Sequence, residues 1–120
     1  TWPWLCTTAE EEIGRLLARL PASIRRRAAT IPVVLEAKPS AAMVEDGLDP
    51  DLMGLFTGNA LNESEPAPVP LQIYLFLRNI WDEAEHDVRA YRQELRRTLL
   101  HEVGHYLGLD EEDLALRDLD

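Results

Sequence analysis

From residue 97 to residue 108 the sequence reads RTLLHEVGHYLG. In this stretch His101 and His105 are four residues apart, and Glu102 directly follows the first histidine. Residues four apart on an α-helix lie on one face, with Cβ atoms about 5–6 Å apart. Two imidazoles at that spacing can each bring a nitrogen to about 2.0–2.1 Å from the same zinc ion. The stretch therefore predicts that one Zn²⁺ is held by His101 and His105.

Glu102 is predicted to be the catalytic residue of this site. It lies about 100° around the helix from His101, outside the ligand pair but within reach of a water on the metal. Zinc lowers the pKa of a bound water to near 7, and a neighbouring carboxylate then accepts its proton as the water attacks a carbonyl. The HExxH spacing therefore predicts a zinc metallopeptidase that hydrolyses peptide (amide) bonds. The opposing interpretation is a pair of exposed histidines on a solvated helix face.

A long helix, from about residue 85 to residue 107, is expected to carry these residues. Its apolar residues recur in steps of three and four, the spacing of a buried stripe, and they are Val88, Tyr91, Leu95, Leu99, Val103 and Tyr106. On a helical wheel the two histidines lie away from this stripe, and Glu102 lies at its border. Gly104 disfavours a helix, so we expect it to pack closely against the sheet. Gly108 is well placed as the left-handed residue that ends the helix.

The identity of the third zinc ligand stays open at this point. A catalytic zinc usually has three protein ligands and one open position, and neither His nor Cys follows His105. A local third ligand must therefore be a carboxylate, and the candidates are Asp110, Glu111, Glu112, Asp113, Asp118 and Asp120. Asp110 and Asp113 also fit the cap and the third position of a final short helix, from residue 111 to about residue 119.

The rest of the chain predicts a small α+β fold. Thr8-Ala9-Glu10-Glu11 fits a capping box, so a helix is expected from there to Leu20, with residues 1–7 as an N-terminal tail. The further expected elements are a helix over 22–29, strands over 31–37, 52–57 and 71–77, and a proline-rich surface loop over 62–70. We expect one domain over residues 1–120, with a mixed sheet of three to four strands packed against helices. The strand over 71–77 is the candidate edge strand for binding an extended peptide.

Composition narrows the choice of partners. The 120 residues carry a formal net charge of -10, which repels phosphate backbones and anionic lipid. We therefore expect a peptide or protein substrate, and neither nucleic acid nor a membrane. Cys6 is the only cysteine, which excludes an internal disulfide and favours a reducing, cytoplasmic location. The sequence begins with Thr1 rather than Met, which also fits the removal of an N-terminal segment such as a signal peptide.

Residues 101–111, HEVGHYLGLDE, resemble the HExxHxxGxx(D/E) signature of the minimal zincin-like family. Members of this family are described as zinc-dependent proteases with a matrix-metalloprotease-like domain. The resemblance extends from about Ala9 to Leu116, and its further pieces are residues 55–58 (LFTG), 61–64 (LNES), 73–80 (IYLFLRNI) and 97–100 (RTLL). It implies that residues 1–120 form a single zincin-like domain with a compact α+β fold, one zinc ion and Glu111 as the third metal ligand.

The chain also departs from the larger zincins. Glu111 stands where metzincins have a third histidine, and both methionines precede the motif, so no Met-turn can follow it. The second half of an ordinary zincin cleft is therefore missing. The alternative function is a zinc-binding interaction or regulatory module with weak or vestigial hydrolase activity. A third interpretation is a toxin-like or regulatory partner without a metal.

Overall fold

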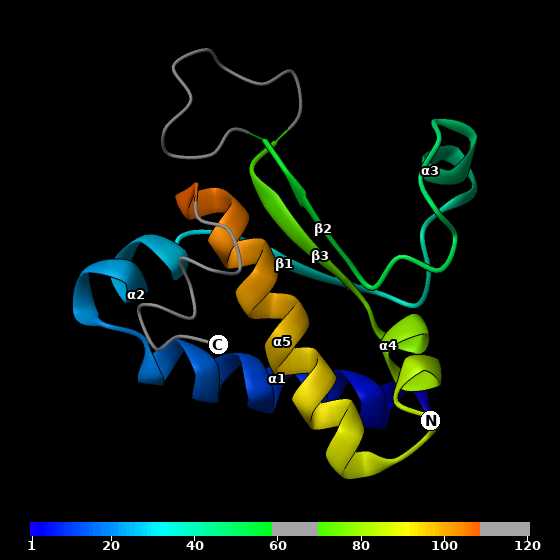
Figure 1. The fold of residues 1–120 in the computed structure, drawn as a ribbon, viewed down its shortest axis with the longest axis horizontal. Helices are drawn as coiled ribbons and strands as arrows, with labels where there is room; N and C mark the ends of the chain where they lie inside the picture. Colours follow the sequence, from blue (N-terminus) through cyan, green and yellow to red (C-terminus); the bar gives the residue numbers. More distant parts are fainter. Residues whose placement is uncertain (59–69, 109–120) are drawn as a thin grey trace.

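The computed structural model describes residues 1–58 and 70–108, which form a mixed α+β fold (Figure 1). The helices are α1 (Trp2–Arg19), α2 (Ala22–Ala28), α3 (Ala41–Glu45), α4 (Leu77–Glu83) and α5 (Val88–Leu107). The strands are β1 (Val33–Glu36), β2 (Gly54–Thr57) and β3 (Gln72–Phe76). The expected fold class is confirmed, and each strand lies within its expected range. The final helix expected from residue 111 and nearly all of the expected loop over 62–70 lie outside the described residues.

The three strands form one mixed sheet in the order β1-β3-β2. β3 pairs in parallel with β1, with Ile73 opposite Val33, and antiparallel with β2, with Leu75 opposite Gly54. The expectation that residues 71–77 form an edge strand is therefore wrong. A strand that is apolar on both faces is typical of the middle of a sheet, and Phe76 is fully buried there. In the described part of the chain, the edge strands are β1 and β2.

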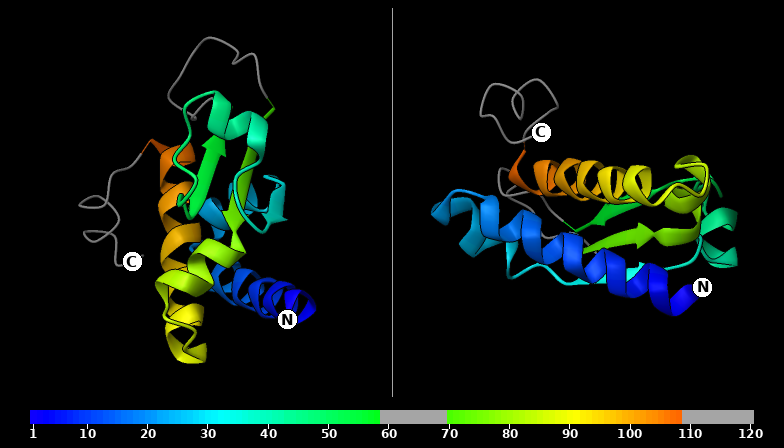
Figure 2. Two further views of the ribbon diagram at one scale, coloured as in Figure 1. Left: turned by 90° about the vertical axis from the view of Figure 1, so that its right-hand side faces the viewer. Right: turned by 90° about the horizontal axis from the view of Figure 1, so that it is seen from below.

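Helix α5 lies along β2 and β3, and α1 crosses α5 (Figures 1 and 2). The predicted stripe of α5 faces this packing from Tyr91 onward, because Tyr91, Leu95, Leu99, Val103 and Tyr106 are all buried. Val88 was wrongly included in the stripe: it is 49% exposed, in the first turn after the N-cap Asp87. No helix in the described ranges is long and apolar enough to cross a membrane.

The first helix, α1, begins at Trp2, so residues 2–7 are helical and do not form the expected tail. The Thr1 side chain caps α1 by accepting a hydrogen bond from the backbone amide of Trp4. Leu5 is buried, and its carbonyl accepts a hydrogen bond from the Tyr91 hydroxyl at 2.9 Å. Thr8, the expected cap, is therefore a buried residue in the middle of α1. Packing against α5 overrides the local capping pattern.

The predicted long helix begins three residues later than expected, at Val88, and a helix that was not expected lies before it. Residues 77–83 form α4, and α5 begins only at Val88. Between them Glu85 and His86 have φ values of 55° and 62°, in the left-handed region, which interrupts helical geometry. The Asp87 side chain then caps α5 by accepting from the amide of Ala90 at 2.8 Å. The short helix α3, between β1 and β2, was also not expected.

A buried carboxylate links α1 to α5. The side chain of Glu12 is 2% exposed, and it accepts hydrogen bonds from Arg92 at 2.9 Å and from Arg96 at 3.0 Å. Arg15 lies 3.4 Å away on the same helix. Burial would raise the pKa of Glu12, but the hydrogen bonds and charges of the two arginines lower it below its ordinary value. The interaction of Glu12 with Arg92 and Arg96 therefore stabilises the fold fully at pH values above the ordinary pKa of a glutamate. This stabilisation is lost as the pH falls through the lowered pKa of Glu12.

We expect removal of the two arginines to destabilise the protein more than removal of Glu12. The double substitution Arg92→Ala with Arg96→Ala leaves a buried carboxylate with only Arg15, and should cost about 3 kcal/mol at pH 7. Glu12→Gln should cost less, roughly 1–2 kcal/mol, because the arginines are partly exposed and can turn to water. Urea unfolding at pH 7 and pH 3 measures both effects, and the difference between Glu12→Gln and the parent should shrink at pH 3. Equal costs at the two pH values would contradict this assignment.

Candidate metal centre

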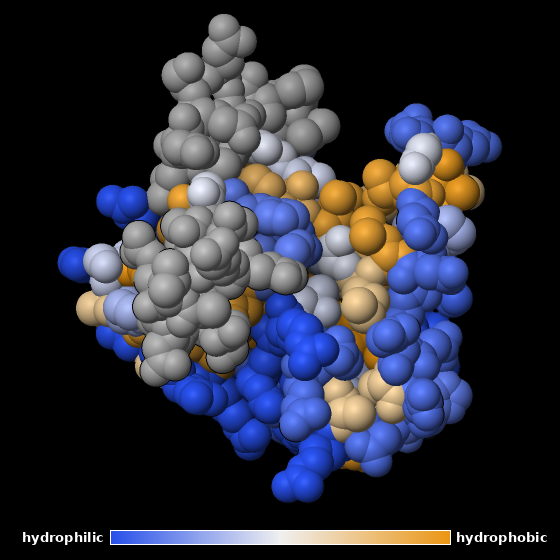
Figure 3. Space-filling model, viewed as in Figure 1, coloured by the Kyte–Doolittle hydropathy of each residue, from blue (hydrophilic) through white to orange (hydrophobic). Residues whose placement is uncertain are grey.

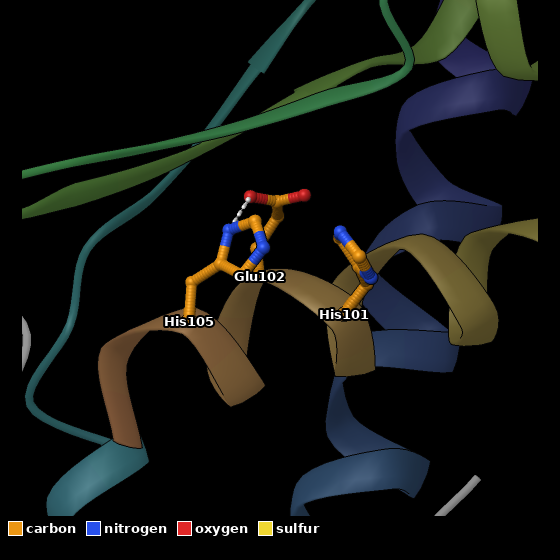
Figure 4. Close-up of side chains that lie close together, drawn as sticks. All are labelled: His101, Glu102 and His105. Carbon is orange, nitrogen blue, oxygen red and sulfur yellow. Dashed lines mark ion pairs between the residues drawn. The ribbon is translucent and has the colours of Figure 1, made fainter. Parts of the chain in front are cut away.

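Three side chains of α5 lie together near its C-terminal end (Figure 4). The ring centroids of His101 and His105 are 4.4 Å apart. One ligand atom from each of His101, Glu102 and His105 lies within 4.8 Å of the other two. The three residues differ in exposure, because His105 faces outward, His101 is half-buried and Glu102 is only 5% exposed. The helix thus brings together the three residues that the HExxH spacing predicted.

The donor set fits a zinc ion. Two imidazoles and a nearby carboxylate are groups that zinc binds or uses in hydrolytic sites. Two atoms that both lie 2.0–2.1 Å from one ion are at most about 4.2 Å apart. The candidate atoms lie within 4.8 Å of one another, so small rotations of the side chains would bring the two imidazoles to one ion. His101 and His105 are the residues that would hold it.

Glu102 is buried on α5, next to His105 and to strand β2. Its Oε1 lies 3.2 Å from Nδ1 of His105, and its carboxylate points towards the strands in Figure 4. Burial raises the pKa of Glu102 above the ordinary value, while the positive charge that His101 can carry and a hydrogen bond from the Phe56 backbone act against the rise. From the sequence, Glu102 was expected at the border of the apolar stripe. In the structure its side chain is buried beside that stripe.

Strand β2 packs directly over Glu102, and this neighbour was not expected from the sequence. Gly54 is buried, and a Cβ at this position would lie 3.3 Å from Cγ of Glu102 and 2.6 Å from Cγ2 of Thr98. The ring of Phe56 contacts Tyr106 of α5, with centroids 6.1 Å apart. The available signal was the glycine inside the apolar run LMGLFT, because a strand glycine often marks close approach of another backbone or side chain.

The end of α5 follows the predicted pattern. Gly108 has a φ of 73°, and its amide donates to the carbonyls of Gly104 and His105. Gly104 is buried, as expected for a position of close packing. Glu111, the third ligand implied by the family resemblance, and the alternatives Asp110, Glu112, Asp113, Asp118 and Asp120 lie outside the described residues. The third ligand therefore stays a prediction.

Comparison with known proteins assigns the chain to a family. A family model described as zincin-like metallopeptidase matches residues 28–119. The match covers the whole described sheet, helices α4 and α5, and the stretch from His101 to His105. No curated protein matches the chain. On its fold, its His-Glu-His cluster and the extent of this match, the chain belongs to the zincin-like metallopeptidase family.

Proposed function

We propose that the chain is a zinc-dependent metallopeptidase that hydrolyses peptide bonds with Glu102 as the general base. The observation that carries the proposal is the placement of one buried carboxylate beside two imidazoles on the same helix face. An exposed acidic cluster would be common without a metal, but Glu102 is 5% exposed. A buried carboxylate with a perturbed pKa is typical of functional sites.

In this proposal Glu102 carries the proton transfers, and a bound zinc ion activates the water and the substrate. Bound zinc would supply a water of lowered pKa and polarise the substrate carbonyl. Glu102 would accept the proton of the attacking water at a carboxylate oxygen and then deliver it to the leaving nitrogen. Burial raises the pKa of Glu102 in the metal-free chain, and the charge of a bound zinc ion would act against this rise.

The edge of β2 is the place where we expect an extended peptide to bind. β2 runs past Glu102, and no described strand pairs with its outer edge. A peptide that adds to a sheet edge gains main-chain hydrogen bonds without a demand on its sequence. Figure 3 shows apolar surface gathered beside β2 and towards α3, and Leu52, Met53 and Leu55 are half-buried in this segment. We therefore expect a peptide or protein substrate that binds in extended form with apolar side chains.

Metal removal tests the proposal. The purified chain, loaded with zinc and desalted, should hold about one zinc ion and cleave members of a generic peptide library. A chelator should abolish cleavage, and zinc should restore it where magnesium does not, because magnesium prefers octahedral oxygen ligands. Mass spectrometry of the library and metal analysis measure the two properties. Stoichiometric zinc without any cleavage would instead favour the interaction module with vestigial activity, and absence of zinc would contradict both.

A further inference from the structure

At Gly54, strand β2 lies against α5 with no room for a side chain. A Cβ at this position would lie 2.6 Å from Cγ2 of Thr98, which is closer than real Cβ contacts allow. It would also lie 3.3 Å from Cγ and 3.4 Å from Oε2 of Glu102. The strand therefore rests on the helix at this point only because residue 54 has no side chain, and the atoms that it meets include the carboxylate of Glu102.

Contacts of residues before and after Gly54 in the sequence hold β2 close to α5. Before the strand, the buried Asn79 donates from Nδ2 to the carbonyls of Pro50 at 2.8 Å and Leu52 at 2.9 Å. Further along the strand, the Phe56 ring packs on Tyr106, and the Phe56 backbone hydrogen-bonds to Glu102. β2 is thus fixed to α4 at one end and to α5 at the other, with Gly54 between these points.

We propose that Gly54 is a positioning residue, which lets β2 hold the carboxylate of Glu102 against the Phe56 amide in the orientation that hydrolysis needs. The inference rests on the proposed function for its catalytic consequence. A side chain at residue 54 would push the carboxylate or the strand, and either movement separates Glu102 from the Phe56 backbone. In this role Gly54 acts through Glu102, because the atoms that a side chain at residue 54 would meet include the carboxylate of Glu102.

Thr98 provides the variant that separates positioning from simple packing. In Gly54→Ala the new methyl group meets both Thr98 and Glu102, so the protein can lose stability as well as activity. Thr98→Ser removes Cγ2, the atom at 2.6 Å. In the double variant Gly54→Ala with Thr98→Ser, the atom at 2.6 Å is gone, and the next two nearest atoms to the new methyl group both belong to Glu102, at 3.3 and 3.4 Å. The matched comparison is therefore the double variant against Thr98→Ser alone.

We expect the double variant to melt close to Thr98→Ser but to hydrolyse peptides with a kcat about 10-fold lower at equal zinc content. A shift of about 1 Å in a reacting group can cost 10²-fold, and the displacement required here is a few tenths of an ångström. A kcat equal to that of Thr98→Ser would overturn the proposal, because the methyl group would then be tolerated beside the base.

The amide resonance of Phe56 in the zinc-free protein gives a second readout that needs no activity. Gly54→Ala in the Thr98→Ser background should move this resonance, since the amide loses part of its hydrogen bond to Glu102. When Glu102→Ala is also present, adding Gly54→Ala to Thr98→Ser should move the Phe56 resonance much less. Equal movement in both backgrounds would overturn the proposal, because residue 54 would not act through Glu102. If the parent protein shows no hydrolysis, the proposed function fails, and the Phe56 resonance still decides the role of Gly54.

Discussion

Replacement of Glu102 by Gln should lower peptide hydrolysis about 10²–10⁴-fold, the usual contribution of a positioned general base. Glutamine keeps the size and the hydrogen-bonding carbonyl of the side chain, but it does not accept a proton at neutral pH. Because Glu102 lies beside the two imidazoles rather than acting as one of the predicted ligands, zinc content should stay at one ion per chain. The measurements are kcat/KM on a cleaved library peptide and metal analysis of the same sample.

A second carboxylate of α5 provides the control for this variant. Glu94 lies about two helical turns before His101 in α5, where it pairs at 2.9 Å with the largely exposed Arg97. Glu94→Gln removes a similar charge from the same helix and should change kcat/KM by less than twofold, since exposed ion pairs contribute little. Full activity of Glu102→Gln would place the base elsewhere. Loss of zinc from Glu102→Gln would make Glu102 a ligand or an essential partner of a ligand.

The features predicted best from the sequence are those set by local spacing. The i,i+4 histidines share a face of α5 because helical geometry alone determines it, and Gly108 ends the helix in the left-handed conformation that such a glycine favours. The apolar run of β3 predicted its strand in the same way, since residues 72–76 have no competing helical pattern. Each of these features needs only the residues that form it.

The errors occur where contacts between distant residues decide the structure. Thr8 matches a capping box, but Leu5 is held by Tyr91, 86 residues away in the sequence, and the helix begins at Trp2 instead. The order of the strands depends on the pairing of β3 with both neighbours, which no local pattern in residues 71–77 contains.

The same limit applies within the site. The identity of Glu102 follows from the HExxH spacing, but its burial follows from Gly54, which precedes it by almost half the chain. A sequence pattern therefore predicts which groups carry the chemistry. The surroundings of the proposed base come from a strand whose position depends on Asn79, Phe56 and Tyr106.

Replacement of either His101 or His105 by Ala should lower zinc affinity by more than about 10²-fold. Loss of a residue that only supports a ligand already costs about 10–100-fold, and a site reduced to fewer ligands holds zinc weakly. The third histidine of the chain provides the control. His86 pairs with Asp82 at 2.9 Å, away from the cluster, and His86→Asn suits its φ of 62° because asparagine tolerates this region. Competition with a zinc-binding dye should show parental affinity for His86→Asn.

The same titration identifies the third ligand among the acidic residues after Gly108. Glu111→Gln, Asp110→Asn and Glu112→Gln are compared side by side with the two histidine variants. Glu111→Gln should weaken zinc binding nearly as much as His105→Ala, whereas the loss of a helix cap costs only about 0.5–2 kcal/mol of stability and leaves the metal in place. If Asp110→Asn weakens binding and Glu111→Gln does not, the ligand is one residue earlier. If all three variants bind zinc like the parent, the third ligand is not one of these residues, and the family pattern does not extend to this position.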